Sequence, residues 1–352
     1  MTKKVALIGG SFDPVHMGHI NMAKAALEQL NVDEVWFIPT KSTPLKERVL
    51  TDEEHRWGML KLAAAMDERF KVNPVELTRT GRSYTIDTLK QLKKDFEEVE
   101  FYWLIGADQA AQFEKWKDAD QLVQLAQFTA CVRDGQKPEN ACFDFPAIDM
   151  EPTPVSSTEI RNGYKLNYLP DAVLQYILDH ELYIPMWIAN RVSPHRYAHS
   201  CSVAKLCRQL AKAHNLDEHR AWLMGMFHDV AKDMPKEELA KWVKAINPYG
   251  LMDHHAIWHG YAGSEIADRV FGVKDPSVKN AIFNHVKGTS YDVYAMVLFI
   301  ADKLDPLRGY DSSGMINACM HDLYNGFMLV HAENKKFLEK EKKKQPEKGD
   351  LK

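Results

Sequence analysis

A glycine-rich turn with two histidines follows the first apolar run of the chain. Residues 5–8 are Val-Ala-Leu-Ile, and residues 9–12 are Gly-Gly-Ser-Phe. Glycines let the backbone approach a ligand closely, and the start of a helix attracts phosphate. His16 and His19 stand three residues apart where a helix is expected to begin. Both imidazoles can therefore point N–H groups at one anionic group, although a plain turn with two surface histidines has the same composition.

A second segment with the same character lies near residue 160. Ser156, Ser157 and Thr158 carry hydroxyl groups where another helix is expected to begin, so they can cap it and leave N–H groups for phosphate. Arg161 adds a permanent positive charge. Alone, this pattern is an ordinary helix cap; together with the glycine-rich turn it favours a nucleotide site.

Four histidines and two aspartates in the second half of the chain stand on apolar helical stripes. One such histidine is usually a hydrogen-bonded core residue, but six polar groups on inward faces are better explained by metal ions. Asp302 is the clearest, because residues 293–304 are apolar nearly all round and a buried carboxylate needs a partner. The donors are nitrogen and oxygen, which suits Fe, Mn, Zn, Co or Mg. The predicted ligands are His199, His228, Asp229, His259, His285 and Asp302.

The elements that must position these groups differ between the two halves. The first half alternates strand and helix signals, which predicts an α/β fold with a doubly wound parallel sheet. Ligands of such sheets sit beyond the carboxyl ends of the strands, where the turn 9–12 lies. The predicted strands are 5–8, 35–39, 70–72, 101–106 and 128–132, and the predicted helices include 53–66 and 85–96.

From about residue 188 strand signals stop and amphipathic helices follow one another, which predicts an all-α half. We therefore predict an α/β domain over 1–187, an all-helical domain over 188–334 and a basic tail over 335–352. The tail has almost no apolar residues, so we expect it to be disordered. The predicted helices of this half are 195–214, 218–232, 260–271, 276–286 and 293–304.

The segments 9–19 and 156–161 resemble the H-x-G-H and S-x-T-x-x-R signatures of the nucleotidyltransferase superfamily. The segments 78–88 and 105–108, with Lys115-Trp116, make residues 1–187 similar to bacterial nicotinate-nucleotide adenylyltransferases. The resemblance implies a Rossmann-like fold that transfers AMP from ATP to nicotinate mononucleotide. Pyrophosphate is released, Mg²⁺ assists, and no covalent intermediate forms.

The resemblance also implies roles for residues of the ATP site. His16, His19 and Arg161 would act as catalytic groups that hold the ATP phosphates, with Lys46 nearby. Gly106 and Asp108 would hold the ribose side of ATP. The ATP-binding residues implied are Gly9, Gly10, Ser11, Phe12, His16, His19, Gly106, Asp108, Ser156 and Arg161.

A separate set of residues would bind the nucleotide acceptor. Thr85 and Trp116 would face the pyridine ring, and Arg133 would contact the phosphate of the mononucleotide. Trp116 could instead be a packing partner of Phe113.

The order of the six predicted ligands resembles HD-domain phosphohydrolases with two metals, in which Asp229 would bridge the ions. The segments 195–200, 227–232, 259–263 and 300–308 are similar to the bacterial family that cleaves diadenosine tetraphosphate symmetrically to two ADP. This resemblance implies two divalent or mixed-valence metals, iron foremost, with Mn, Co or Zn as alternatives. It also implies catalytic roles for Asp229 and Lys232 and a phosphate contact for Arg308.

We thus predict a bifunctional enzyme whose partners are ATP, nicotinate mononucleotide and diadenosine tetraphosphate. Other functions of the helical half stay open: a nucleotidase, a guanosine tetraphosphate hydrolase or a non-catalytic module that binds nucleotide. The sequence leaves the oligomeric state undetermined.

Composition narrows the class of protein. The formal net charge of the 352 residues is −4, which argues against a nucleic-acid-binding protein. The chain has no apolar run of bilayer length and no signal-peptide pattern, so we expect no membrane association. The five cysteines form no C-x-x-C pair, which fits a reducing cytoplasm.

Overall fold

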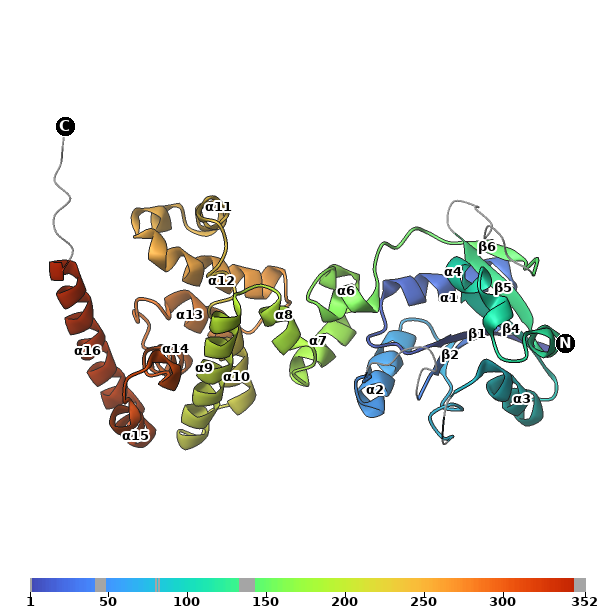
Figure 1. The fold of residues 1–352 in the computed structure, drawn as a ribbon, viewed down its shortest axis with the longest axis horizontal. Helices are drawn as coiled ribbons and strands as arrows, with labels where there is room; N and C mark the ends of the chain where they lie inside the picture. The colour runs from blue at the N-terminus through green and yellow to red at the C-terminus, as the bar shows by residue number, and fades with distance from the viewer. Residues whose placement is uncertain (1, 42–48, 80, 82, 133–142, 345–352) are drawn as a thin grey trace. The chain divides into compact units, whose positions relative to one another are not determined.

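The chain divides into two compact units, Met1–His180 and Glu181–Lys352, in a computed structural model (Figure 1). The structure describes residues 2–41, 49–79, 81, 83–132 and 143–344, without the side chains of 341–344. The division falls after residue 180, seven residues before the boundary predicted from the sequence at residue 187.

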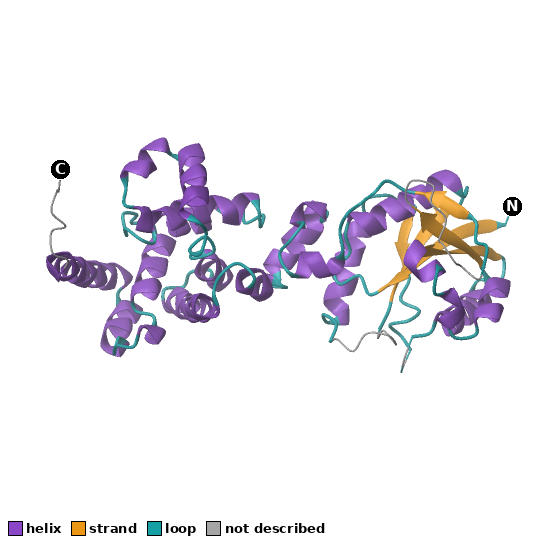
Figure 2. Cartoon of the chain, turned by 45° about the horizontal axis from the view of Figure 1, so that its top comes forward, coloured by secondary structure: helices purple, strands orange, loops and turns teal. Residues whose placement is uncertain are grey.

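The first unit contains a six-stranded sheet in which all paired strands are parallel (Figure 2). The strand order β3-β2-β1-β4-β5-β6 places the reversal of strand order between β1 and β4. The doubly wound α/β prediction is therefore confirmed. The strands are β1 (Lys3–Gly10), β2 (Glu34–Pro39), β3 (Phe70–Val72), β4 (Val99–Gly106), β5 (Gln127–Val132) and β6 (Ala147–Asp149).

Helices cover both faces of this sheet, because side chains of successive residues in a strand point to opposite faces. Val5 and Leu7 of β1 belong to one buried cluster with Leu89 and Leu122, which come from α3 and α5. The helices α1 and α2 pack against β1, β2 and β3. The helices of this unit are α1 (Met17–Gln29), α2 (Glu53–Ala64), α3 (Thr85–Asp95), α4 (Ala107–Ala110), α5 (Ala119–Leu125), α6 (Ser157–Arg161) and α7 (Asp171–Asp179), with 3₁₀ turns η1 (Phe113–Lys115) and η2 (Leu166–Tyr168).

The second unit is helical throughout its described residues, as predicted. Its α9 and α10 pack closely, since a Cβ on Gly225 would lie 2.4 Å from the Cα of Ala204. Every residue of α14 from Tyr294 to Asp302 is buried. The helices are α8 (Ile184–Ala189), α9 (Pro194–Ala213), α10 (Glu218–Phe227), α11 (Lys236–Ile246), α12 (Trp258–Arg269), α13 (Pro276–Asn284), α14 (Val293–Lys303), α15 (Ser313–His321) and α16 (Leu323–Lys344), with 3₁₀ turns η3 (Pro248–Met252), η4 (His255–Ile257) and η5 (Pro306–Arg308).

Two helices end earlier than predicted, each at a histidine. The helix predicted over 218–232 ends at Phe227, and the helix predicted over 276–286 ends at Asn284. In both cases the next residue turns its side chain back onto the chain. His228 Nδ1 donates to the Gly225 carbonyl at 2.7 Å, and His285 Nδ1 donates to the Ile282 carbonyl at 2.7 Å. Such a bond competes with continuation of the helix.

The tail also differs from its prediction. Residues 335–344 continue α16, whereas residues 345–352 lie outside the described part of the chain. The helix is held by buried Leu323, Phe327 and Val330, and Lys and Glu residues have high helix propensity. Packing at its start therefore allows an otherwise polar segment to stay helical.

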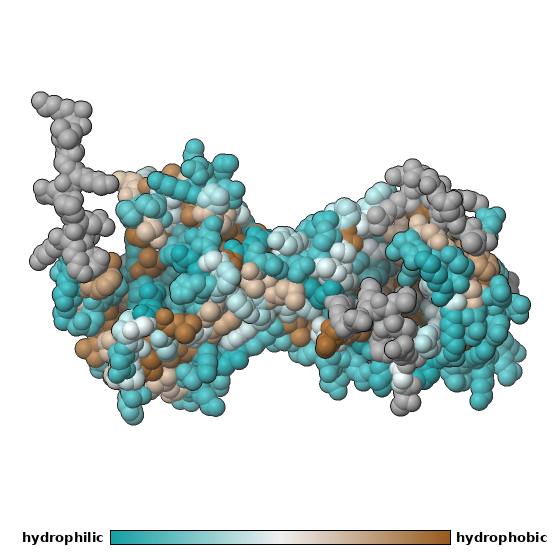
Figure 3. Space-filling model, viewed as in Figure 1, coloured by the Kyte–Doolittle hydropathy of each residue, from teal (hydrophilic) through white to brown (hydrophobic). Residues whose placement is uncertain are grey.

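The surface is mostly hydrophilic on the face drawn in Figure 3, with smaller hydrophobic patches. None of the helices among the described residues combines the length and apolar character needed to cross a bilayer. The four cysteines in the described ranges, Cys131, Cys201, Cys207 and Cys319, are free thiols.

Candidate active sites

The end of β1 and the start of α1 bring the two predicted histidines together. His16 occupies the N-cap position of α1, and its backbone N–H donates to His19 Nδ1 at 3.2 Å. The two ring centroids are 3.9 Å apart. The buried ring of Phe12 packs 5.0 Å from His19, so it supports that imidazole from the core side. These residues thus form one polar corner at the carboxyl end of the sheet.

A pocket of about 510 Å³ lies at this corner, and its lining includes His16, His19, Gly106, Asp108 and Cys131. The lining residues come from the carboxyl ends of β4 and β5, from α1 and the residue before it, and from the segment that follows β6, next to the reversal of strand order. This is where doubly wound sheets bind ligands. A Cβ on Gly106 would lie 2.7 Å from the carboxylate of Asp108, so a larger residue at this position would push that carboxylate aside.

Both histidines are neutral at pH 7. Burial lowers the pKa of His16 to about 4. Burial also holds the pKa of His19 well below its usual value, and repulsion between the two imidazoles when both are protonated lowers it further. The Nδ1 of His16 is buried and has no hydrogen-bond partner among the described residues. These imidazoles are therefore suited to hydrogen bonding a phosphate, and they carry no charge of their own before a ligand arrives.

The second predicted motif is bonded to the first motif. Ser156 caps α6 and forms a reciprocal capping box with Glu159. Ser157 Oγ donates to the Pro14 carbonyl at 2.9 Å, and Arg161 donates to the backbone carbonyl of Asp13. Ser156 and Arg161 do not line the pocket that contains His16. The structure therefore places α6 beside the loop 13–14.

The predicted residues Gly9 and Gly10 end β1, and Ser11 follows them. A Cβ on Gly9 would lie 2.7 Å from the ring of Trp103, so this glycine allows β1 and β4 to pack. The Ser11 carbonyl accepts a hydrogen bond of 2.9 Å from Arg56, a buried residue of α2 that also donates to the carbonyls of Thr40 and Thr51. Sequence reasoning missed Arg56, because only long-range contacts distinguish it from a surface arginine.

A second pocket brings the two predicted pyridine-site residues together. Thr85 at the start of α3 and Trp116 after η1 both line it, with Tyr84, Lys117 and other residues. The Trp116 ring also lies 5.3 Å from the ring of Phe113, so the tryptophan both packs and lines the pocket. Tyr84 was not singled out from the sequence, although it lies within the segment 78–88. Lys46 and Arg133 lie outside the described residues.

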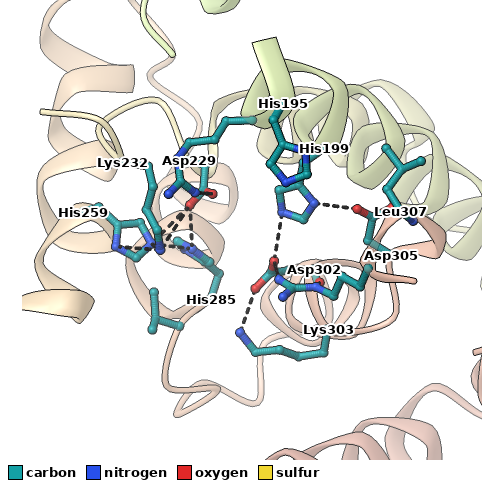
Figure 4. Close-up of a pocket in the computed structure, with 13 residues that line it drawn as sticks. His195, His199, Asp229, Lys232, His259, His285, Asp302, Lys303, Asp305 and Leu307 are labelled. Atoms are coloured by element: carbon teal, nitrogen blue, oxygen red, sulfur yellow. Dashed lines mark hydrogen bonds and ion pairs between the residues drawn. The ribbon is translucent and has the colours of Figure 1, made fainter. Parts of the chain in front are cut away.

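The helical unit gathers all six predicted metal ligands into two adjacent groups. Figure 4 labels His199, Asp229, His259, His285 and Asp302 of these ligands. Within each group the potential ligand atoms lie within 4.8 Å of one another. The groups draw on α9, α12 and α14 and on the ends of α10 and α13, so five helices must pack correctly to form them. The first group is His199, His228 and Asp302, and the second is Asp229, His259 and His285.

Asp229 belongs to the second group and also faces the first group. Its Oδ1 is 3.2 Å from His259 Nε2 and 3.7 Å from His285 Nε2, while its Oδ2 is 3.8 Å from His228 Nε2. One carboxylate oxygen thus faces each group. This arrangement fits a carboxylate that bridges two cations.

The protonation states suit cation binding. For Asp229 and Asp302, burial would raise the pKa, but the neighbouring histidines and lysines outweigh it, so both stay ionised. Burial lowers the pKa of His228 and His259 to about 4, which leaves neutral imidazoles. His199 differs: burial opposes its protonation, but hydrogen bonds to Asp302 and Asp305 raise its pKa to about 9. A cation would have to displace that proton.

Basic side chains surround this pocket of about 330 Å³. Lys232 lies 3.0 Å from His259 Nε2, and Arg308 donates to Asp302 at 2.6 Å. Lys303 and Arg196 also line the pocket, and neither was predicted from the sequence. Buried donors for cations, surrounded by basic groups, can accommodate metal ions together with several phosphates.

The chain matches two family models in the same order as its two units. The cytidylyltransferase-like family matches residues 7–163, and the HD domain family matches residues 196–307. Both matches agree with the fold found for each unit.

Relatives extend these matches along nearly the whole chain. The probable nicotinate-nucleotide adenylyltransferase/Ap4A hydrolase of Mycoplasma pneumoniae is 28% identical, covering 92% of this chain and 97% of that protein. Its namesake in Mycoplasma genitalium is 31% identical, covering 88% of this chain and 89% of that protein. The probable nicotinate-nucleotide adenylyltransferase of Opitutus terrae is 39% identical over 52% of this chain and 98% of its own length. The chain therefore belongs to the family of two-unit nicotinate-nucleotide adenylyltransferase/Ap4A hydrolases.

Proposed function

We propose that the α/β unit transfers AMP from ATP to nicotinate mononucleotide and that the helical unit cleaves diadenosine tetraphosphate into two ADP. The observation that carries this proposal is the match to the Mycoplasma genitalium relative over 88% of the chain. Each unit also has its own pocket lined by residues suited to phosphate chemistry.

In the transfer reaction, a phosphate oxygen of the mononucleotide attacks the α-phosphorus of ATP. The bond from that phosphorus to the bridging oxygen breaks, and pyrophosphate leaves. His16 and His19 donate hydrogen bonds to the ATP phosphates as neutral imidazoles, and Arg161 adds charge beside the loop 13–14. Thr85 and Trp116 hold the pyridine ring in their shared pocket. Positioning and charge stabilisation then account for the catalysis, with Mg²⁺ accompanying ATP.

In the hydrolysis reaction, water attacks one of the two central phosphorus atoms and the bridge between the two central phosphates breaks. Each product is then ADP, and the proton of the water passes to solvent. Bound divalent ions would supply an activated water and neutralise phosphate charge. His199, His228 and Asp302 would hold one ion, and Asp229, His259 and His285 would hold the other. The metal proposed is iron, as the resemblance to the hydrolase family implies; imidazole and carboxylate donors also suit Mn, Co or Zn.

Basic residues complete the hydrolytic site. Lys232 and Arg308 bind the phosphates of the substrate, since both line the pocket beside the predicted ligands. The Lys232 side chain is 30% exposed and the Arg308 side chain is 41% exposed, so both charges are accessible to a phosphate that enters the pocket.

Product analysis tests both halves on the full chain. With ATP, Mg²⁺ and nicotinate mononucleotide, we expect nicotinate adenine dinucleotide and pyrophosphate in equal amounts. With diadenosine tetraphosphate and Mn²⁺, we expect ADP alone, and a mixture of AMP and ATP would refute symmetric cleavage. Faster turnover of guanosine tetraphosphate or a mononucleotide would assign the helical unit to another substrate. Elemental analysis of the purified protein identifies the metal.

A further inference from the structure

The four histidines of the metal-ligand groups differ in what holds their second ring nitrogen. His228 and His285 each donate from Nδ1 to a backbone carbonyl. His259 has the Lys232 ammonium 3.0 Å from its Nε2 and 3.3 Å from its Nδ1, so this lysine does not hold the Nδ1 alone. His199 alone among them donates from Nδ1 to a carboxylate, that of Asp305, at 2.6 Å. Its Nε2 points the other way, 3.2 Å from Asp302 and 3.3 Å from His228.

Asp305 is itself held firmly. It lies at the start of η5 and is 1% exposed. Its Oδ1 accepts hydrogen bonds from Ser202 Oγ at 2.5 Å and from the Leu307 N–H at 3.2 Å. Ser202 stands three residues after His199 on α9, so both side chains lie on the same helical face. Asp305 therefore links η5 to α9 at the position of His199.

We propose that Asp305 is a positioning residue that fixes the tautomer and ring plane of His199, so that His199 Nε2 presents its lone pair to an ion in the first group. Carboxylates that hold the far nitrogen of a histidine ligand raise its basicity and typically change metal affinity by about 10–100-fold. No bond from Asp305 to Asp229, His259 or His285 is found among the described residues. Asp305 thus tunes one of the two ion sites. The inference rests on the metal site of the proposed function and is independent of the substrate.

A purely structural role for Asp305 makes a different prediction. Asp305→Asn keeps the size of the side chain and an oxygen that can accept from Ser202 and Leu307, so a structural role predicts near-normal behaviour for this variant and damage from Asp305→Ala. A positioning role instead predicts that Asp305→Asn itself weakens metal binding. The new amide N–H₂ can donate to His199 Nδ1, which would place the proton on Nε2 and block the lone pair. Asp305→Glu keeps the charge and should recover part of the affinity.

Titration of the metal-free full chain with Mn²⁺, followed by calorimetry or by competition with a coloured chelator, tests the proposal. We expect Asp305→Asn to weaken one of two binding events by about 10–100-fold and the other by less than about threefold. Ser202→Ala should weaken the same event less. Asp253→Asn is the matched control, because that carboxylate bonds Tyr261 and Lys287 in the same unit and no metal-ligand residue. Thermal melting shows whether each variant is folded.

Several results would overturn the proposal. It fails if folded Asp305→Asn binds both ions as the unchanged protein does, if it loses both to the same degree, or if Asp305→Ala is worse while Asp305→Asn is normal. It also fails if the unchanged protein binds no ion. An error in the proposed substrate would give a different result: the unchanged protein would bind Mn²⁺ but release no ADP from diadenosine tetraphosphate.

Discussion

In the α/β unit, the candidate site is built from short stretches of chain: residues 9–19 and 105–108 supply most of the corner at the end of the sheet. In the helical unit, the six candidate ligands come from five helices or their ends and span more than one hundred residues from His199 to Asp302. The first site relies on neutral histidines, a helix start and close backbone approach. The second concentrates ionised carboxylates in a buried pocket.

The difference between the two sites reflects what phosphate binding and metal binding each require. A nucleotide phosphate can be held by backbone groups and neutral donors at a helix start, and a short loop supplies these. Two cations need buried anionic ligands from several directions, and only packed helices can supply those. The first site should therefore tolerate changes at single positions better than the second, and the predictions below test this contrast in order of expected effect.

The largest effect is expected at the residue between the two ligand groups. Asp229→Ala should reduce hydrolysis of diadenosine tetraphosphate by about 10³-fold or more, since it removes a ligand facing both groups and several kcal/mol of transition-state stabilisation. Adenylyl transfer by the same preparation is the internal control and should stay within about twofold. Loss of both activities would mean that the two sites are coupled, which contradicts the contrast drawn above.

His16 provides the corresponding test in the α/β unit. His16→Ala should slow adenylyl transfer by about 10²–10³-fold, as expected for one lost donor to the reacting phosphates, and leave hydrolysis unchanged. His16→Asn should recover part of the rate, because a buried histidine with a pKa of about 4 acts as a neutral donor. Equal rates for the two variants, measured as kcat with saturating ATP, would argue against hydrogen bonding by a neutral group.

A smaller effect is expected at the pyridine pocket. Trp116→Ala should raise KM for nicotinate mononucleotide by about 10-fold, the loss of one stacking contact, with KM for ATP changed by less than about threefold. Trp57, half-buried on α2, is the control position for removing a tryptophan from the same unit. An equal rise in both KM values would show that Trp116 packs against Phe113 to support the unit and does not select the acceptor.

The smallest effect is the pH dependence of the free energy of unfolding, which has opposite signs for His16 in the first site and His199 in the second. Because burial disfavours protonation of His16 in the folded protein, the unfolded chain binds this proton more readily. The free energy of unfolding is therefore unaffected by His16 above pH 6.5 and decreases as the pH falls from 6.5 towards about 4. His199 has a raised pKa, so its contribution is complete below pH 6.5 and is lost as the pH rises through about 9. The slope is at most about 1.4 kcal/mol per pH unit for each group.

Calorimetric melting of the metal-free chain between pH 4 and pH 9.5 measures both slopes. We expect His16→Asn to flatten the acid side of one transition and His199→Asn to flatten the alkaline side of the other. If both variants change the same transition, the two units do not unfold independently.

Much of the fold was predictable because burial leaves a local pattern. The runs at 5–8 and 101–106 are continuously apolar, and they form the two central strands of a sheet covered on both faces. β6 was missed, since its three residues pair only with β5 at the sheet edge and carry no such pattern. The premature ends of α10 and α13 were also missed, because a histidine that bonds back to a carbonyl has no signature in helical periodicity.

Some residues of the candidate sites were also predictable from the sequence, and others were not. The six metal-ligand candidates were predictable as polar residues on inward faces, and the structure brings all six together. Asp305 and Arg56 received no role, because their importance lies in partners 106 and 45 residues away along the chain. Lys303 and Arg196 join the pocket only through the packing of α14 and α9.

By itself the sequence determined the two fold classes, the order of the two units and the residue types available for phosphate and metal chemistry, since each is encoded in short-range pattern and composition. The tertiary structure alone decided that Asp229 faces both ligand groups and that Asp305 holds His199. It also decided that α6 joins the loop 13–14. The physical reason is that these are contacts between distant segments, and they exist only once hydrophobic burial has fixed the distances between strands and helices.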